Sequence, residues 1–247
     1  MLSKNKLKQL ATYRQQKNCE AENLFVIEGE KLLSEALSNQ VQLIAICALD
    51  EWLLAQSAPI PETTELFEVS YPELERLSLL KTPNKVWALA RRPLQPALPP
   101  MTDSLIIALD HLQDPGNLGT IIRTADWFGI RTIVCSPDTV SCFNPKVVQS
   151  TMGSLFRTHL FYTNLPSWLN TCNRPVYGAL LGGNNLYETQ LQQPAVLAIG
   201  NESKGLSQAV RQCVTQSIAI PNIGQTCESL NASVATAILI NEFFSRH

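Results

Sequence analysis

The sequence contains no run of 18 or more consecutive apolar residues, so no membrane-spanning helix is expected. Its lysine-rich beginning has no apolar stretch of the kind found in secretory signal peptides. None of the seven cysteines forms a C-x-x-C pair or has a histidine nearby in sequence, which predicts reduced core thiols and no metal site. The G-x-G-x-x-G and Walker patterns are also missing, which disfavours a dinucleotide-dependent dehydrogenase. A cytoplasmic protein is the resulting expectation.

Net charge is small, but the charged residues are unevenly distributed. The 247 residues carry a formal net charge of -2, so bulk charge does not indicate a nucleic-acid-binding protein. Residues 1–17 nevertheless contain five basic side chains and no acidic one, and residues 81–92 contain four and none. If the fold brings these two basic runs together, they attract phosphate groups; otherwise they are two solvated surface stretches. The sequence leaves both interpretations open.

Two domains are predicted, separated by a segment with four prolines in eight residues. Proline disfavours helix and cannot pair inside a sheet, so residues 93–103 are expected to form an extended linker. In residues 1–92, strand-like and helix-like segments alternate after a basic helix at 4–17, which predicts a small α/β domain. The alternation continues in residues 104–247, where an almost unbroken apolar strand at 104–109 predicts a parallel-sheet α/β domain.

The first segment that carries chemistry is residues 110–125, where the apolar strand ends and a helix begins. Ligands of open α/β sheets bind at this carboxyl end of the strands. Asn117 is expected to cap the helix or to lie at its N-terminus. Arg123 lies within an apolar stripe, where an arginine is either a surface residue that reaches into solvent or a buried anion clamp.

The second segment, residues 195–206, is an apolar strand that breaks into a polar, glycine-flanked turn. Glycine, asparagine and serine are ordinary turn residues, so a plain turn is one interpretation. The other interpretation is a site where a second backbone closely approaches Gly200 and Glu202 is held beside it.

The third segment, residues 218–244, is a short apolar strand, a polar loop and a helix that is apolar almost all round. Such a helix must be buried, either in a core or against another subunit. Ser229 or Asn231 can cap it. Because Ser229 is not in a G-x-S-x-G turn, the pattern argues against a hydrolase nucleophile.

Taken in this order, the three segments resemble the SpoU (TrmH-type) RNA ribose methyltransferases of the SPOUT superfamily. The motifs N-x-G-x-x-x-R-T-A, G-N-E-x-x-G and I-P-x-x-G…S-L-N-x-S-x-A are matched at residues 117–125, 200–205 and 220–235. Residues 151–157 resemble a further family stretch, M-G-[AS]-x-F-R. Residues 23–30, after the basic helix, resemble the substrate-binding module that precedes many SpoU domains.

This resemblance implies a deep C-terminal trefoil knot, a homodimer formed through the terminal helix, and S-adenosyl-L-methionine as the methyl donor. Knots run against the usual rules of chain connection, so periodicity and spacing could not indicate one. The residues implied to line the donor pocket are Leu180, Gly182, Ile199, Gly200, Asn201, Ile220, Ser229 and Leu230.

The implied reaction is methyl transfer to a ribose 2′-hydroxyl of rRNA or tRNA. The residues implied to act in it are Arg123, Asn117, Glu202, Ser229 and Asn231. The family's arginine is proposed as a general base, but a guanidinium pKa exceeds about 12, so Arg123 can instead clamp a phosphate and stabilise the developing oxyanion. Asn117, Glu202 and Asn231 are implied to position Arg123 and the ribose. The N-terminal domain is implied to hold the RNA across the dimer.

Two alternatives share the same fold. One is a SPOUT enzyme that methylates a base; Arg123 and the Ser-Leu-Asn pattern at 229–231 favour ribose instead. The other is a non-catalytic RNA-binding or assembly factor, which the intact motif set disfavours. The sequence identifies neither the RNA nor the nucleotide.

Overall fold

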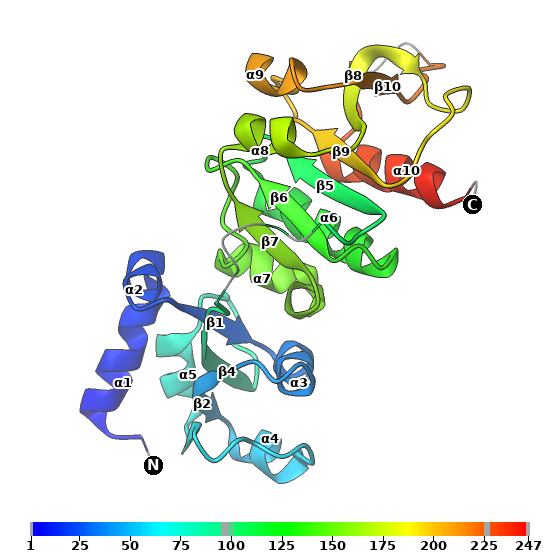
Figure 1. The fold of residues 1–247 in the computed structure, drawn as a ribbon. Helices are drawn as coiled ribbons and strands as arrows, with labels where there is room; N and C mark the ends of the chain where they lie inside the picture. Colours follow the sequence, from blue (N-terminus) through cyan, green and yellow to red (C-terminus); the bar gives the residue numbers. More distant parts are fainter. Residues whose placement is uncertain (1, 95–98, 100, 225–227, 246–247) are drawn as a thin grey trace. The chain divides into compact units, whose positions relative to one another are not determined.

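The computed structural model describes residues 2–94, 99, 101–224 and 228–245 (Figure 1). The chain divides into two compact units, Met1–Leu94 with Phe143–Phe156, and Gln95–Cys142 with Arg157–His247. Each unit contains one β-sheet. Part of the expected linker, residues 95–98 and 100, and Cys227 lie outside the described residues.

The first unit holds a four-stranded sheet of mixed direction. Its strands, in spatial order, are β1 (Leu24–Glu28), β4 (Val86–Arg91), β2 (Leu43–Ala48) and β3 (Glu65–Glu68). Strand β4 runs antiparallel to β1 and β2, whereas β2 and β3 are parallel. Its helices are α1 (Lys4–Ala11), α2 (Gln16–Ala21), α3 (Glu30–Ser38), α4 (Asp50–Ala55), α5 (Tyr71–Leu77) and α7 (Pro145–Thr151), with 3-10 turns at Thr12–Arg14 and Ser154–Phe156. The predicted alternation of strands and helices is present.

The single basic helix predicted at residues 4–17 is wrong, because the chain turns between α1 and α2. The Thr12 hydroxyl donates to the Gln9 carbonyl at 2.7 Å, and the Asn18 amide donates to the Thr12 carbonyl at 2.7 Å. These side chains thus donate to backbone carbonyls that would accept from backbone N–H groups if the helix continued, and α1 ends here. The turn places Tyr13 in the core of this unit.

Residues 143–156 belong to the first unit, although they follow β6 of the second in sequence. Phe25 of β1 contacts the rings of Phe143 and Phe156, with centroids 5.0 and 6.4 Å apart. The Gln149 amide donates to the Glu28 carbonyl at 2.9 Å. Aromatic packing and this hydrogen bond attach the segment to β1.

Gly153, in the stretch that resembles M-G-[AS]-x-F-R, has a structural role. Its φ is +98°, and a Cβ at this position would lie 2.6 Å from the Cγ of Glu35. The backbone conformation and the packing against α3 therefore both require glycine here.

The second unit holds a six-stranded sheet in which all neighbouring strands are parallel. Its strands, in spatial order, are β10 (Gln216–Ala219), β8 (Val176–Asn185), β9 (Ala195–Ile199), β5 (Leu105–Leu109), β6 (Thr132–Cys135) and β7 (His159–Tyr162). Its helices are α6 (Pro115–Trp127), α8 (Leu165–Thr171), α9 (Gln208–Arg211) and α10 (Ala232–Ser245). The predicted parallel-sheet α/β domain is confirmed. Helices α8 and α9 were not predicted; α9, with four residues, is too short to show a helical period.

Helices cover both faces of the six-stranded sheet (Figure 1). Trp168 of α8 and Val210 of α9 pack with Val196 in one apolar core. On the other face, Phe243 of α10 contacts Tyr177 of β8 edge-on, with ring centroids 5.2 Å apart. Helix α10 also packs against α6. The site described below therefore rests on a rigid three-layer support.

Helix α10 is buried on one side only within a single chain. Leu239, Ile240 and Phe243 are buried, which confirms the predicted burial for that side. Val234 stays 48% exposed, and Trp127, at the end of the neighbouring α6, is 86% exposed. A large apolar surface on these two helices is thus left uncovered.

Within the described ranges, no helix combines the length and apolar character needed to cross a membrane. The six described cysteines form no disulfide bond with one another, and Cys19, Cys47, Cys135 and Cys142 are buried. Burial raises the pKa of the Cys47 thiol to about 12, so this thiol stays protonated and unreactive at neutral pH.

Candidate functional site

The chain around β8, β9 and β10 encloses one cavity of about 670 Å³. Its lining comes from residues 179–182 of β8, 199–205 after β9, 218–223 at and after β10, and several positions between 228 and 239. Strand β9 lies next to β5, and the strand order reverses at β5, since β6 and β7 follow on its other side. Open parallel sheets bind their ligands at such a reversal, outside the carboxyl ends of the strands.

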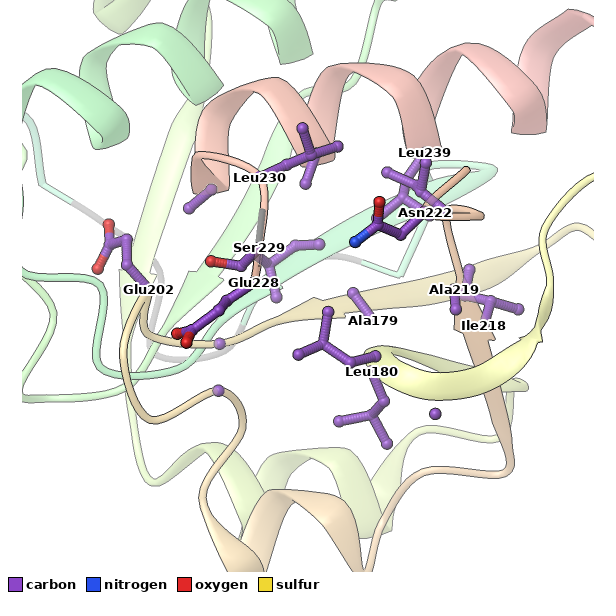
Figure 2. Close-up of a pocket in the computed structure, with 18 of the residues that line it drawn as sticks. Ala179, Leu180, Glu202, Ile218, Ala219, Asn222, Glu228, Ser229, Leu230 and Leu239 are labelled. Carbon is purple, nitrogen blue, oxygen red and sulfur yellow. The ribbon is translucent and has the colours of Figure 1, made fainter. Parts of the chain in front are cut away.

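The cavity has two chemically different sides (Figure 2). The carboxylates of Glu202 and Glu228 and the hydroxyl of Ser229 lie toward one side. The apolar side chains of Ile218 and Leu239 lie toward the other, together with the amide of Asn222. The cavity therefore offers an apolar wall to a ring system and charged groups to an ionic part of the same ligand.

The residues that the sequence assigns to the donor pocket all line this cavity: Leu180, Gly182, Ile199, Gly200, Asn201, Ile220, Ser229 and Leu230. Of the residues assigned to catalysis, Glu202 and Ser229 also line it. The structure places Asn117 and Asn231 in contact with this set and leaves Arg123 outside it, as the following geometry shows.

Gly200 is required by the path of the chain itself. A Cβ at this position would lie 2.2 Å from the carbonyl carbon of Gly205 and 2.3 Å from the backbone nitrogen of Leu206. Asn201 and Gly205 exchange backbone hydrogen bonds of 3.1 and 2.8 Å, which fold the turn back onto the end of β9. The backbone that approaches Gly200 closely is thus the chain's own turn.

Three polar side chains from distant segments form one hydrogen-bonded network beside the cavity. The Asn117 amide nitrogen donates to Oε1 of Glu202 at 2.7 Å, and the Asn231 amide nitrogen donates to Oδ1 of Asn117 at 2.9 Å. Asn117 is buried and Glu202 is half-buried. Since both ends of the Asn117 amide are engaged, its orientation is fixed and Glu202 is held at the cavity edge.

Helix caps hold this network in place. Oδ1 of Asp114 accepts from the Asn117 backbone nitrogen at 2.7 Å, so Asp114 caps α6 and Asn117 lies in its first turn. Oδ1 of Asn231 accepts from the backbone nitrogens of Ser233 and Val234 at 2.9 and 3.3 Å. Of the two cap candidates for α10, the structure therefore selects Asn231, which caps with its oxygen and binds Asn117 with its nitrogen.

Arg123 lies apart from the network within a single chain. It is exposed on α6, does not line the cavity, and makes no ion pair or side-chain hydrogen bond with any residue that the structure describes. Of the two interpretations left open by the sequence, the surface residue is the correct one for the single chain. Trp127 follows four positions later, so Arg123 and Trp127 share the open face of α6.

Sequence reasoning missed further polar residues of the cavity lining, namely Lys204, Arg211, Asn222 and Glu228. Lys204 lies inside the predicted polar turn and could have been found there. Arg211 is presented by α9, whose shortness left no signal. The buried carboxylate of Asp110 was also missed; it accepts from the Ser207 backbone nitrogen at 2.6 Å and ties the start of α9 to the end of β5.

Comparisons with known proteins match both parts of the chain. Residues 104–241 match the SpoU rRNA Methylase family, and residues 4–88 match the MRM3-like substrate binding domain. The 23S rRNA (guanosine(2553)-2'-O)-methyltransferase RlmP of Bacillus subtilis is 32% identical over 222 residues, which cover 88% of this chain and 87% of RlmP.

Solved structures are similar over the whole length. A structure ascribed to the TrmH family of RNA methyltransferases, from Porphyromonas gingivalis, has a TM-score of 0.90 at 37% identity and covers 100% of both chains. An AdoMet-bound rRNA methyltransferase from Sinorhizobium meliloti has a TM-score of 0.87 at 26% identity, covering 100% of this chain and 97% of that one.

Proposed function

The chain belongs to the SpoU rRNA methylase family, and on that premise we propose that it transfers a methyl group from S-adenosylmethionine to a ribose 2′-hydroxyl of rRNA or tRNA. One observation carries the proposal: two segments that match family motifs line one cavity, and Asn117 of a third is joined to them beside it through the Asn117–Glu202–Asn231 network. A parallel-sheet fold alone does not require such a network, so the site supports the function independently of the fold.

The cavity suits S-adenosylmethionine in size and in chemistry. Its volume of about 670 Å³ falls within the range of about 300–1,000 Å³ typical of small-molecule sites. The apolar side suits the adenine ring, and the carboxylates suit a molecule that carries a sulfonium charge. Gly182 faces open space where a Cβ would lie, so a ligand can approach the backbone there. When bound, the cofactor supplies an electrophilic methyl group.

The side chains beside the cavity must prepare the ribose. A hydroxyl is a weak nucleophile until its proton is removed or its developing negative charge is stabilised. Asn117 binds Oε1 of Glu202 and leaves Oε2 of this carboxylate available to a ribose hydroxyl. Asn231 fixes Asn117, and the Ser229 hydroxyl lies on the same side of the cavity as Glu202. These four residues orient the ribose in our proposal.

Arg123 supplies positive charge in this proposal. Its positively charged guanidinium is suited to hold a substrate phosphate and to stabilise negative charge on the 2′-oxygen. The parallel N–H donors of the Arg123 guanidinium match the arrangement of two phosphate oxygens. The exposed position of Arg123 on α6 leaves it free to meet a ligand that a single chain does not hold.

A homodimer would complete the site. Trp127 of α6 is 86% exposed and Val234 of α10 is 48% exposed, and these two helices pack together. Large apolar side chains left open on adjacent helices are typical of subunit interfaces. Because Arg123 shares the face of Trp127, a second copy packed on this face would receive Arg123. The arginine would then act at the cavity of the partner, although it does not line its own.

The proposed division of labour follows the predicted domains: residues 1–92 hold RNA, 93–103 link, and 104–247 carry the methyltransferase site with a C-terminal trefoil knot. For the knot, the support is that β10 lies at the sheet edge beyond β8, whereas the α10 that follows it packs on α6.

For RNA binding by the first unit, the support is that Lys6 and Arg91, one from each basic run, line the same small cavity of about 180 Å³. Such a substrate places the proposed activity in the cytoplasm.

A transfer assay tests the proposed function. The full-length protein is incubated with S-adenosylmethionine tritiated in its methyl group and with 23S rRNA or tRNA transcripts, and the RNA is then hydrolysed in alkali. Alkaline cleavage needs a free 2′-hydroxyl, so we expect the label in alkali-resistant dinucleotides. Label in a methylated base on unmodified ribose would support the base-methylating alternative. Failure to bind S-adenosylmethionine in calorimetry would support the non-catalytic one.

A further inference from the structure

Arg211 is one of two cationic residues in the cavity lining, and no motif of the sequence marks it. The other is Lys204. Glu202 and Glu228 are the acidic residues of the same lining. The cavity thus carries charges of both signs, and a ligand that fills it with the matching charges would be bound in one direction only.

The position of Arg211 is fixed by the fold around α9. The Ser207 backbone nitrogen donates to the buried Asp110 carboxylate at 2.6 Å, and Val210 is fully buried in the apolar core. The Arg211 backbone nitrogen donates to the Ser207 carbonyl at 2.9 Å. The start of α9 is therefore anchored to β5, and its last residue is held at the cavity.

The guanidinium of Arg211 is held as well. Its Nε donates to the Leu206 carbonyl at 2.9 Å. Gly205 has a φ of +67°, and a Cβ there would lie 3.2 Å from Nη2 of Arg211, so the terminal nitrogens pass close to the backbone of the turn. No described residue accepts a hydrogen bond from the two Nη atoms. One edge of the guanidinium is thus anchored, and the other is available to a ligand.

An anchored guanidinium with free Nη atoms is suited to a carboxylate. Two parallel N–H groups match the two oxygens of a carboxylate, and the hydrogen bonds are strengthened by charge. Arg211 and Lys204 are both exposed, but no described residue accepts a hydrogen bond from the Lys204 ammonium, which is a point charge on a long side chain. S-adenosylmethionine carries one carboxylate, in its methionyl group, and its sulfonium and ammonium groups suit the carboxylates of Glu202 and Glu228 instead.

We propose that Arg211 binds the carboxylate of the methionyl group of S-adenosylmethionine and so sets the direction in which the cofactor enters the cavity. The inference rests on the proposed function, because it takes S-adenosylmethionine as the ligand. It assigns Arg211 a positioning role: the residue holds the end of the cofactor that does not react. The same anchoring would apply to S-adenosylhomocysteine, which keeps the carboxylate.

Calorimetry with two product-like ligands tests this assignment without any RNA. S-adenosylhomocysteine contains the methionyl-derived carboxylate, whereas 5′-methylthioadenosine lacks the whole amino-acid part. We expect Arg211→Ala in the full-length protein to weaken S-adenosylhomocysteine binding about 10- to 100-fold, the loss typical of a charge-assisted pair. Binding of 5′-methylthioadenosine should change by less than about two-fold, because the adenine side is untouched.

Two further variants serve as controls. Arg211→Lys keeps the charge but loses the fork, so it should recover only part of the lost affinity. Lys204→Ala removes a charge from the same cavity and should weaken S-adenosylhomocysteine by no more than about three-fold. Equal losses in Lys204→Ala and Arg211→Ala would overturn the proposal, since general positive potential would then account for binding.

Other outcomes separate this inference from the proposed function. If the unaltered protein binds neither ligand, the proposed function fails. If it binds both and Arg211→Ala binds S-adenosylhomocysteine as tightly, the function stands and the role of Arg211 is wrong. A higher KM for a 23S rRNA transcript in that variant, with unchanged ligand binding, would assign Arg211 to an RNA phosphate and would also overturn the proposal. An equal loss for both ligands would indicate damage to the cavity and contradict a specific carboxylate contact.

Discussion

The two units of the chain use their charged side chains differently. In the first unit, Lys6 pairs with Glu65 at 2.5 Å and Lys85 with Glu51 at 3.2 Å. The guanidinium of Arg14 donates to backbone carbonyls at the end of α5. Several members of the two basic runs are therefore engaged within the unit itself.

In the second unit, the two cations of the cavity and Arg123 on α6 lack acidic partners among the described residues, although Arg211 also donates to a backbone carbonyl. Arg123, Lys204 and Arg211 form no ion pair with the residues that the structure describes. An exposed ion pair contributes little to stability, about 0–1 kcal/mol, and mainly holds side chains in place. A cation without a protein partner is instead available to a charged ligand. Substitutions of cations in the second unit should therefore lower methyl transfer strongly, whereas those in the first unit should have small effects on RNA binding.

The largest expected effect is at Arg123. Arg123→Ala should lower methyl transfer by about 100- to 1,000-fold, the loss typical of one group that stabilises developing negative charge. Binding of S-adenosylhomocysteine should be unchanged, because Arg123 does not line the cavity. Single-turnover transfer of tritiated methyl groups measures the first quantity and calorimetry the second. Arg123→Lys, which keeps the charge, should lose less; full activity in Arg123→Ala would remove this residue from the mechanism.

The next effect concerns the open face of α6. Trp127→Glu should convert a dimer to a monomer and lower transfer about 100-fold, because the arginine of the second copy is lost. The melting temperature of the monomer should hardly fall, since Trp127 is 86% exposed in a single chain. Analytical ultracentrifugation gives the oligomeric state. A monomeric variant with full activity would show that the single chain is sufficient.

Mixing two inactive variants tests whether Arg123 acts in its own subunit. Gly182→Phe fills the open space at the cavity wall and should prevent cofactor binding. In a heterodimer formed by random mixing of Arg123→Ala and Gly182→Phe, the Arg123→Ala subunit keeps an unaltered cavity. That cavity receives the unaltered arginine of the Gly182→Phe subunit, so one of the two sites is complete. Activity should then recover to about a quarter of that of the unaltered protein. No recovery would mean that each arginine serves its own cavity.

In the first unit, a smaller effect is expected at Arg91, which is exposed and lines the cavity where the basic runs meet. Arg91→Ala should weaken RNA binding only a few-fold and lower the slope of log affinity against log salt by about one. Transfer at saturating RNA should not change. Filter binding of a 23S rRNA transcript at several salt concentrations checks both. A loss of turnover at saturating RNA would show that Arg91 of the first unit also affects the chemical step, contrary to the proposed difference between the two units.

The smallest expected effect is a pH dependence of stability at Glu28. Burial raises the pKa of this carboxyl group, although Ser78 donates to it at 2.5 Å and the Leu79 backbone nitrogen at 2.9 Å. The folded chain thus holds this proton at pH values where the unfolded chain has released it. Stability from Glu28 is present below the unfolded pKa and declines as the pH rises through the folded pKa.

Glu28→Gln removes this titration. Its amide oxygen can still accept from the Leu79 backbone nitrogen, and its amide nitrogen can donate to the Ser78 hydroxyl oxygen, so its effect on stability should be about 1 kcal/mol or less. Relative to the unaltered protein, the variant should gain melting temperature as the pH is raised from 4 toward 8, by about 2–4 °C. Methyl transfer should not change. A pH-independent difference would show that burial does not raise the pKa of the Glu28 carboxyl group.

Most of the cavity lining could be predicted from the sequence only through the resemblance to SpoU methyltransferases, whereas the pattern of strands and turns alone pointed to Gly200 and Glu202. In an apolar strand such as β9, the change from apolar to polar residues shows where the strand ends. The polar turn residues that follow indicate a loop that can face a ligand. Gly200 stands at such an end. The alternation of strands and helices was predictable for the same reason, since buried strands leave an apolar pattern in the chain.

Three features could not be predicted, each for a physical reason. The Asn117–Glu202–Asn231 contacts join distant segments, and local sequence does not encode the orientation of an amide. The turn that ends α1 depends on the hydroxyl of Thr12, which local pattern treats as an ordinary helix residue. Short elements such as α9, which presents Arg211, contain too few residues to show a period.

Ribose methylation by this protein is tested most directly by mapping 2′-O-methylated positions across rRNA and tRNA from cells that contain or lack it. A third strain should carry Arg123→Ala. We predict that at least one 2′-O-methyl group disappears with the protein, stays absent with Arg123→Ala and returns with the unaltered chain. An unchanged set of ribose methylations, or the loss of a methylated base in its place, would contradict the account.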